Sequence, residues 1–272
     1  MFFQGSNNSG HRSQFCDLRL WSMVAILSLW GCGDSPKKRI KNPVLLQQVK
    51  RVALVSFAID RKYTVGSGED EQTEDNIEAA LAFGGVHFAA VSKSIKEAAA
   101  GLILDIDQTL ASKAYKKQPQ SPSYLRKGRA IIGSDHEFIS PFNDVRAIAL
   151  DAESSRRICR DLGVDAALAI EVTYKLDSGM NLPILGTFIK PSWYAEVHTV
   201  SELYHSTGEL IWRSDLKVKS PLKVKAAKAL NVYVYSSSSV TGDQTFDLVK
   251  SAATEASKRV IEALRSDIAG NR

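Results

Sequence analysis

Residues 156–172, RRICRDLGVDAALAIEV, join an amphipathic helix to a buried strand through a single glycine. The pattern predicts a helix that begins at Asp151, or at the serines that follow it, and ends at Leu162. Gly163 then occupies the position after the helix, where a left-handed backbone favours glycine. Residues 164–176 begin as an apolar run and end in alternation, which is typical of a strand. The helix is therefore expected to pack on the sheet that contains this strand.

Other segments also have strand patterns. Residues 51–59, RVALVSFAI, are almost wholly apolar, as in a strand that is buried on both faces. Residues 193–204 and 210–218 alternate, and the turn between them places Gly208 where a positive φ is needed. This spacing predicts an antiparallel hairpin. Residues 232–235 are expected to form a further short strand.

The remaining helices are predicted from apolar spacing and from glycine and proline. A helix over residues 74–82 should end at Gly84-Gly85, because glycine disfavours a helix interior. Apolar residues recur every three or four positions in two longer segments, which predicts helices over residues 91–117 and 246–268. Two segments are expected to be loops because of their Pro, Gly and Asn content: residues 118–123 and 133–144.

Composition agrees with a globular protein. The chain has 272 residues, of which 44% are hydrophobic and 24% charged, and these fractions exclude a collagenous, fully disordered or polytopic membrane protein. The net charge of +5 is small and scattered, so it does not indicate a nucleic-acid partner. The order of elements predicts the α/β class: a single mixed-sheet sandwich with helices packed on the sheet, preceded by a signal segment. The domain is expected to span residues 44–272.

The amino-terminal residues 1–31 have the organisation of a signal peptide. Arg12 and Arg19 precede an apolar run at residues 20–30, LWSMVAILSLW. A membrane-spanning helix needs about 20 residues, so this run is too short to cross a bilayer, but it suits the apolar region of a secretory signal.

Leu29-Trp30-Gly31-Cys32 follows this run and resembles the lipobox of bacterial lipoproteins. The resemblance implies cleavage between Gly31 and Cys32 and attachment of a diacylglycerol to the sulfur of Cys32. Trp30 departs from the usual pattern, in which a small or β-branched residue stands. The alternatives are a cleaved signal without lipid, and an uncleaved segment that is either an anchor or not a signal.

Residues 32–43 are polar and contain proline, so they are expected to form a tether between lipid and domain. Asp34 lies one place beyond the position that is associated with retention in the inner membrane. The resemblance therefore favours the periplasmic side of the outer membrane over the inner membrane. Cleavage would remove Cys16 and lipidation would consume Cys32, which leaves Cys159 as the single thiol and no possible intrachain disulfide.

Three segments resemble one group of periplasmic α/β domains. They are residues 52–59, residues 156–172 with Leu-Gly-Val-Asp-Ala at their centre, and residues 206–212, Ser-Thr-Gly-Glu-Leu-Ile-Trp. The group comprises the curli-secretion lipoprotein, the lipoprotein activators of peptidoglycan synthases and the amino-terminal domain of TolB. The resemblance implies a binding or assembly role without catalytic residues, and it assigns Gly163 and Gly208 to structural turns. The long lipid-facing hairpins of the curli pore are missing from the sequence, so pore formation is not expected.

An enzymatic alternative comes from residues 102–110, LILDIDQTL. This segment resembles the first motif of haloacid-dehalogenase phosphatases, in which Asp105 would be the nucleophile and Asp107 the acid–base around Mg²⁺. Asp243 and Asp247 resemble a later motif of that family. Against this alternative, the segment continues the helical periodicity of residues 91–117.

No motif indicates a cofactor or metal. The histidines of the mature chain, His87, His136, His198 and His205, have no metal-ligand spacing, although Asp135-His136-Glu137 is a dense polar triplet. Lysines at alternate positions, such as Lys217 and Lys219, suggest either a charged sheet edge or contact with acidic lipid headgroups or an anionic cell-wall polymer. Further lysines of this stretch are Lys223, Lys225 and Lys228.

Overall fold

A parallel pair of strands forms the centre of the sheet in the computed structural model. Strand β2 (Val52–Asp60) lies beside β7 (Ala166–Gly179) in parallel, from Val52 opposite Ala166 to Ile59 opposite Val172. The structure describes residues 37–66, 71–118, 123–126, 136–179, 192–221, 224–225 and 243–270. All of them belong to the compact unit Asp34–Arg272, and the other unit, Met1–Gly33, lies outside the described residues.

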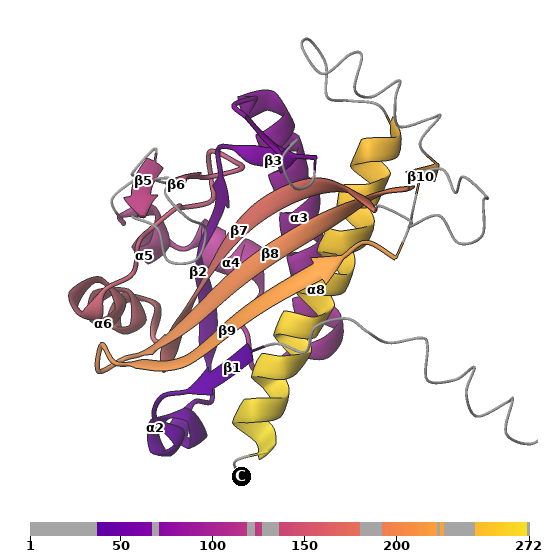
Figure 1. Cartoon of the computed structure of the whole chain (residues 1–272). Helices are drawn as coiled ribbons and strands as arrows, with labels where there is room; N and C mark the ends of the chain where they lie inside the picture. Colours follow the sequence, from indigo (N-terminus) through magenta and orange to yellow (C-terminus); the bar gives the residue numbers. More distant parts are fainter. Residues whose placement is uncertain are drawn as a thin grey trace, which may run out of the picture. The chain divides into compact units, whose positions relative to one another are not determined.

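Antiparallel strands extend this pair on both sides (Figure 1). The order across the sheet is β1-β9-β8-β7-β2-β6-β5, so β1 and β5 form its two edges. Strand β3 also pairs with β7, β4 pairs with β3, and β10 pairs with β8. The sheet is therefore mixed. The outer strands are β1 (Lys37–Ile40), β3 (Tyr63–Val65), β4 (Gln72–Glu74), β5 (Ser123–Arg126), β6 (His136–Ile139), β8 (Ser192–His205), β9 (Leu210–Lys219) and β10 (Val224–Lys225).

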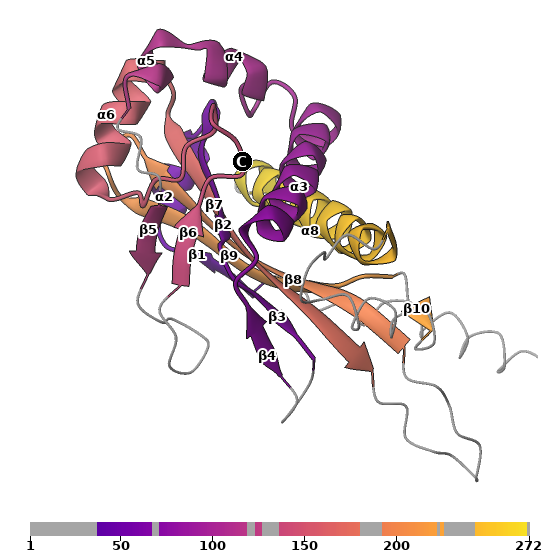
Figure 2. The same ribbon diagram turned by 90° about the horizontal axis from the view of Figure 1, so that it is seen from above.

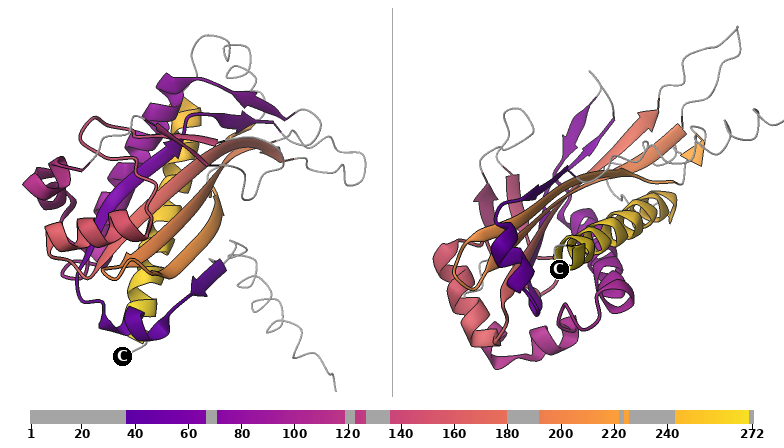
Figure 3. Two further views of the ribbon diagram at one scale, coloured as in Figure 1. Left: turned by 90° about the vertical axis from the view of Figure 1, so that its left-hand side faces the viewer. Right: turned by 90° about the horizontal axis from the view of Figure 1, so that it is seen from below.

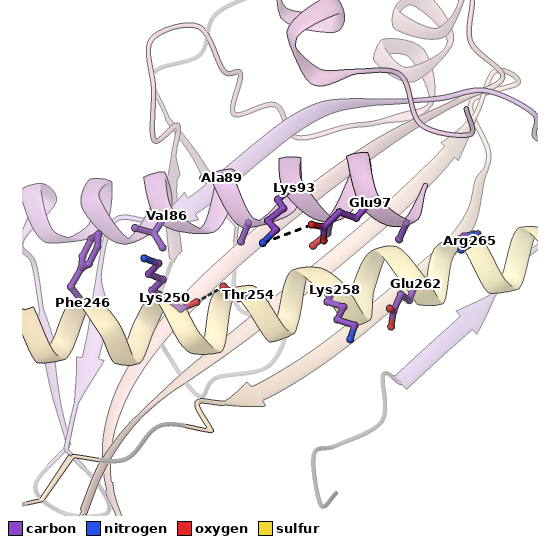
Figure 4. Close-up of a pocket in the computed structure, with 13 residues that line it drawn as sticks. Val86, Ala89, Lys93, Glu97, Phe246, Lys250, Thr254, Lys258, Glu262 and Arg265 are labelled. Atoms are coloured by element: carbon purple, nitrogen blue, oxygen red, sulfur yellow. Dashed lines mark hydrogen bonds and ion pairs between the residues drawn. The ribbon is translucent and has the colours of Figure 1, made fainter. Parts of the chain in front are cut away.

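Two long helices, α3 (Ile77–Ala98) and α8 (Asp243–Gly270), cover one face of the sheet (Figure 2). They run side by side in the same direction, as Figures 1 and 4 both show. The main apolar core lies between them and the sheet, with Phe57, Phe83 and Trp212 fully buried. Because burial of apolar area dominates folding, this layer is the main source of stability.

Helix α6 (Ala152–Leu162) packs on the opposite face, at one end of the sheet (Figure 3). Its buried residues Ile158 and Cys159 meet Ala167 of β7 and Tyr115 of the short helix α5 (Lys113–Lys116). Two more short helices complete the described elements: α2 (Pro43–Gln48) and α4 (Ile106–Ala111). Helices therefore pack on both faces, and the expected mixed-sheet α/β class is confirmed.

The local signals around residues 151–208 are present in the structure. Asp151 caps α6 in a capping box with Ser154, and Gly163 follows the helix at φ 64°. Gly208 has φ 88° in the turn between β8 and β9. Helix α8 matches the predicted helix over 246–268 but begins a few residues earlier, at Asp243.

Two helix predictions are wrong. Helix α3 continues through Gly84-Gly85 instead of ending there, because Gly84 lies where the helix touches β2. The predicted helix over 91–117 is divided: α3 ends at Ala98, and Gly101 turns the chain at φ 86°. The chain then runs beside the start of β2, where Val52 N donates to Leu102 O and Leu104 N donates to Val52 O. Helices α4 and α5 begin after this contact.

The short edge strands differ from the expected loops and tether. Strands β5 and β6 occupy parts of the two segments expected as loops, residues 118–123 and 133–144. Within the expected tether over 32–43, Lys37–Ile40 form β1, which pairs with β9. The predicted strand at 232–235, the signal peptide, Gly31 and Cys32 lie outside the described residues.

Candidate functional site

The long helices α3 and α8 cover one face of the sheet, and the other face, which we call the open face, carries alternating polar side chains beyond the end covered by α6. Successive residues of a strand point to opposite faces. On β7, Ile170 and Val172 belong to the core beneath α3 and α8, so Glu171 and Lys175 point to the open face. Helix α6 covers only one end of this face. Most of the open face of β7, β8, β9 and β1 is therefore available to solvent or to a partner, among the residues that the structure describes.

Ion pairs and hydrogen bonds connect these polar groups across strands. Tyr194 donates to Asp177 at 2.8 Å, and Lys219 donates to Tyr194 at 3.1 Å, with its ammonium group 4.8 Å from the ring centroid. Burial raises the pKa of Tyr194, and the hydrogen bond with Tyr194 raises the pKa of Lys219. Lys175 pairs with Glu71. These contacts hold the side chains in place at the end of the sheet near β3.

A buried ion pair lies further along the same face. Arg213 Nη1 donates to Glu202 Oε1 at 2.7 Å, and the two side chains are 15% and 5% exposed. Such a pair is stable only when both partners are present, because an isolated buried charge costs several kcal/mol. Beside it, His198 Nε2 lies 2.8 Å from Asp215 Oδ1.

A cavity of about 390 Å³ lies beside these pairs, on the open face over the neighbouring strands β1, β9 and β8. We call it the basic edge pocket. Lys37, Arg39 and Lys41 line it and are exposed, and none of them has a side-chain partner among the described residues. The other lining residues are His198, Val200, Leu210, Arg213 and Asp215. The pocket thus combines free cations with a rigid, paired floor, which is an arrangement suited to an anion.

The sequence contains these cations in the stretch Lys-Lys-Arg-Ile-Lys at residues 37–41, but we interpreted them as part of a tether. Their common direction depends on the pairing of β1 with β9, which places Lys37 opposite Asp215 and Arg39 opposite Arg213. The alternating lysines Lys217 and Lys219 of β9 point to the same face, as their spacing predicts.

A second cavity, of about 580 Å³, runs between α3 and α8 on the outer side of the helix layer (Figure 4). Val86, Ala89 and Phe246 form its apolar part. Charges of both signs surround it, and Lys93 pairs with Glu97 at 3.8 Å. The other charged lining residues are Lys250, Lys258, Glu262 and Arg265.

The aspartates of the phosphatase alternative have structural roles. Asp105 caps α4 by accepting from Asp107 N at 2.8 Å, and Asp107 pairs with Lys96 at 3.3 Å. Asp243 and Asp247 lie at the start of α8. Because α3 and α8 run in the same direction and Asp105 follows the end of α3, the two motifs lie at opposite ends of the helix layer. The structure does not bring them together.

Two residues of the polar triplet at 135–137, His136 and Glu137, take part in ion pairs. His136 Nδ1 contacts Asp60 Oδ2, and Arg61 joins Asp75 at 3.0 Å and Glu137 at 3.2 Å. Burial raises the pKa of Asp60, although the hydrogen bond with His136 opposes this. Asp135 lies outside the described residues. Among those that are described, His, Cys, Asp and Glu do not gather in threes that could hold a metal.

The remaining histidines and Cys159 are structural. His87 is fully buried in the core, and burial lowers its pKa to about 3. His205 Nδ1 accepts from Thr207 N at 3.2 Å within the hairpin turn. Burial raises the pKa of Cys159 to about 12, so its thiol is unreactive at neutral pH.

Comparison with known proteins adds little. No family model matches the chain, and no curated protein matches it. A crystal structure of a protein from Xanthomonas campestris, described by the family model DUF330, aligns with 79% of this chain and 83% of its own. The identity is 10% and the TM-score 0.35, a similarity too low to carry a functional argument. In the part of the chain that the structure describes, no helix is long and apolar enough to span a membrane.

Proposed function

We propose that this chain is a lipid-anchored protein of the bacterial cell envelope that acts by binding another envelope component, without catalysis. The anchor is a diacylglycerol on Cys32, and the binding surface is the open face of the sheet. The periplasmic side of the outer membrane is the favoured location. This proposal combines the lipobox-like residues with the position of the folded domain.

The observation that carries the proposal is the short distance in sequence between Cys32 and the sheet. Strand β1 begins at Lys37, five residues after Cys32. The described domain thus begins close to the cysteine that would carry the lipid, as is compatible with a short tether between lipid and domain. The basic edge pocket includes Lys37, so the proposed anchor and the proposed binding surface are close in sequence.

A binding role is supported by how the titratable groups are used. Asp105 caps a helix, His136 pairs with Asp60, and His198 pairs with Asp215. Each of these groups has a structural contact that accounts for its position. Lys37 and Arg39 of β1, by contrast, are exposed and have no side-chain partner among the described residues, which suits recognition of an anionic partner.

Metabolic labelling with an alkyne fatty acid in a bacterial host tests the anchor. The wild-type chain should take up the label, and Cys32→Ser should abolish it because the thioether can no longer form. Cys159→Ser is the matched control and should be labelled like the wild type. An unlabelled wild-type protein that still begins at Met1 would refute the proposal.

A further inference from the structure

We propose that the basic edge pocket binds phosphate groups of anionic phospholipids in the membrane that holds the anchor. This inference rests on the proposed function, because it uses the attachment at Cys32. It adds a ligand class and an orientation: the β1 edge of the open face lies against the membrane surface. Four features of the structure support it.

The first feature is the charge that remains after pairing. Arg213 is neutralised by Glu202 at 2.7 Å. The remaining charged lining residues are three cations, Lys37, Arg39 and Lys41, and one carboxylate, that of Asp215. The pocket therefore has an excess of positive charge that its own residues do not compensate. Arginine and lysine are the side chains that bind phosphate oxygens most strongly.

The second feature is geometry. Lys37 and Arg39 are alternate residues of one strand, so they point to the same face of the sheet. Strand β1 is also the edge of the sheet, which leaves its outer side uncovered by another strand among the described residues. Exposed Lys217 of β9 lies on the same face and extends the positive surface. A flat anionic surface can approach all of these cations at once.

The third feature is the volume of the pocket. A cavity of about 390 Å³ is large enough for a phosphate group together with part of a glycerol headgroup. Its floor is held by the Arg213–Glu202 pair, whose side chains are nearly buried. A pocket with a fixed floor loses less conformational entropy on binding than a flexible surface.

The fourth feature is the reach of the anchor. Lys37 lies five positions after Cys32, and an extended chain spans at most about 3.6 Å per residue. Lys37 therefore lies within about 18 Å of an acylated Cys32. This constraint favours the lipid surface over a cell-wall polymer, because a tether this short keeps the pocket close to the headgroups.

Vesicle co-sedimentation of the full chain carrying Cys32→Ser tests the pocket without the anchor. The probes are phosphatidylcholine vesicles with and without phosphatidylglycerol. The triple variant Lys37→Gln, Arg39→Gln and Lys41→Gln should bind the anionic vesicles more weakly, by about 5-fold for each charge removed. Binding should also weaken as salt is raised, since exposed charges are screened.

The matched control removes the same number of charges from the other side of the sheet: Lys93→Gln, Lys250→Gln and Lys258→Gln in the groove between α3 and α8. The helix layer is about 10 Å thick, so these charges lie beyond a Debye length of about 10 Å from the open face. This control should bind like the parent. The charge-conserving triple Lys37→Arg, Arg39→Lys and Lys41→Arg should also bind normally, which checks that the fold of β1 is retained.

Two results would overturn the proposal. One is equal loss of vesicle binding in the β1 triple and in the groove triple, because net charge alone would then explain it. The other is binding of the parent to purified cell-wall sacculi, lost in the β1 triple, with unchanged binding to anionic vesicles. Failure of the anchor is distinguishable from both, since fatty-acid labelling of Cys32 and vesicle binding of the unacylated chain are measured separately.

Discussion

His87 is a titratable residue in the centre of the core. Its ring makes edge contacts with Phe57 at 5.6 Å and Tyr174 at 6.1 Å between centroids, and its Nδ1 lies 3.4 Å from the Tyr174 hydroxyl. Its Nε2 has no hydrogen-bond partner in the described part of the chain. Burial lowers the pKa to about 3, so the ring is neutral in the folded protein at neutral pH.

We predict that His87 makes the fold sensitive to acid. Between its folded pKa of about 3 and an unfolded value near 6.5, the unfolded chain binds one more proton. The contribution of His87 to the free energy of unfolding is therefore constant above the unfolded pKa and decreases as the pH falls below it. The slope is at most about 1.4 kcal/mol per pH unit. His87→Leu should remove this slope between about pH 4 and 5.5 in urea unfolding curves.

The comparison between wild type and variant isolates the contribution of His87, because other groups, such as Asp60 with its raised pKa, also make stability depend on pH. His205→Asn changes a histidine in the hairpin turn and should retain the wild-type slope. Parallel stability profiles for the wild type and His87→Leu would show that the ring is protonated in the folded state.

At the level of elements, the contact between α3 and β2 depends on one glycine. A Cβ atom at Gly84 would lie 2.6 Å from Ile59 Cδ1 and 2.9 Å from Pro141 Cβ. Ile59 is fully buried, so it has little room to move. At the neighbouring Gly85, a Cβ would lie 3.2 Å from the end of the Phe142 ring, which is partly exposed and free to shift.

We predict that Gly84→Ala and Gly85→Ala change stability in opposite directions. Alanine favours a helix by about 1 kcal/mol over glycine, but overpacking a core costs about 1–3 kcal/mol. Gly84→Ala should therefore lower the free energy of unfolding by up to about 2 kcal/mol, and Gly85→Ala should raise it by about 0.5 kcal/mol. Denaturant unfolding of both variants measures this, and stabilisation by Gly84→Ala would mean that the contact with β2 is looser than described.

The elements that the sequence predicted well are those with local signals. The helix, glycine and strand around Gly163 are recognisable because the cap, the apolar face and the turn residue are neighbours in the chain. The helix over 91–117 was wrong because the apolar spacing continues through Gly101, although the chain leaves the helix there to bond with Val52. Gly84-Gly85 was interpreted as a helix end because the sequence does not show that Ile59 lies opposite.

The candidate site was harder to predict for the same reason. The cations at 37–41 are obvious in the sequence, but their shared face results from pairing with β9, about 170 residues away along the chain. Nothing local distinguishes a short edge strand from a polar tether. The Arg213–Glu202 pair likewise joins two strands, and only the register of the hairpin places the two side chains together.

For the whole molecule, processing should be visible in the number of thiols. The chain as written has Cys16, Cys32 and Cys159. Cleavage and acylation would leave only Cys159, which is buried. We predict that the protein from native membranes has no thiol reactive to Ellman's reagent when folded and one when unfolded in denaturant.

The unprocessed chain would instead give three thiols in denaturant, which is the number in the full sequence. Two thiols would indicate cleavage without lipid, in agreement with the second alternative from the sequence. The measurement therefore separates the three interpretations of the amino terminus without any labelling.

The pairing of β1 with β9 has a mechanical consequence. In an acylated protein, any pull from the bilayer enters the domain through Lys37 and reaches the four-residue ladder before it reaches other strands. Rupture of this ladder would uncover the edge of β9 from Trp212 to Asp215 and would dismantle the basic edge pocket in the same step. Tension on the anchor would thus detach β1 and release the headgroup contacts. The exposed edge of β9 could then pair with a strand of another chain.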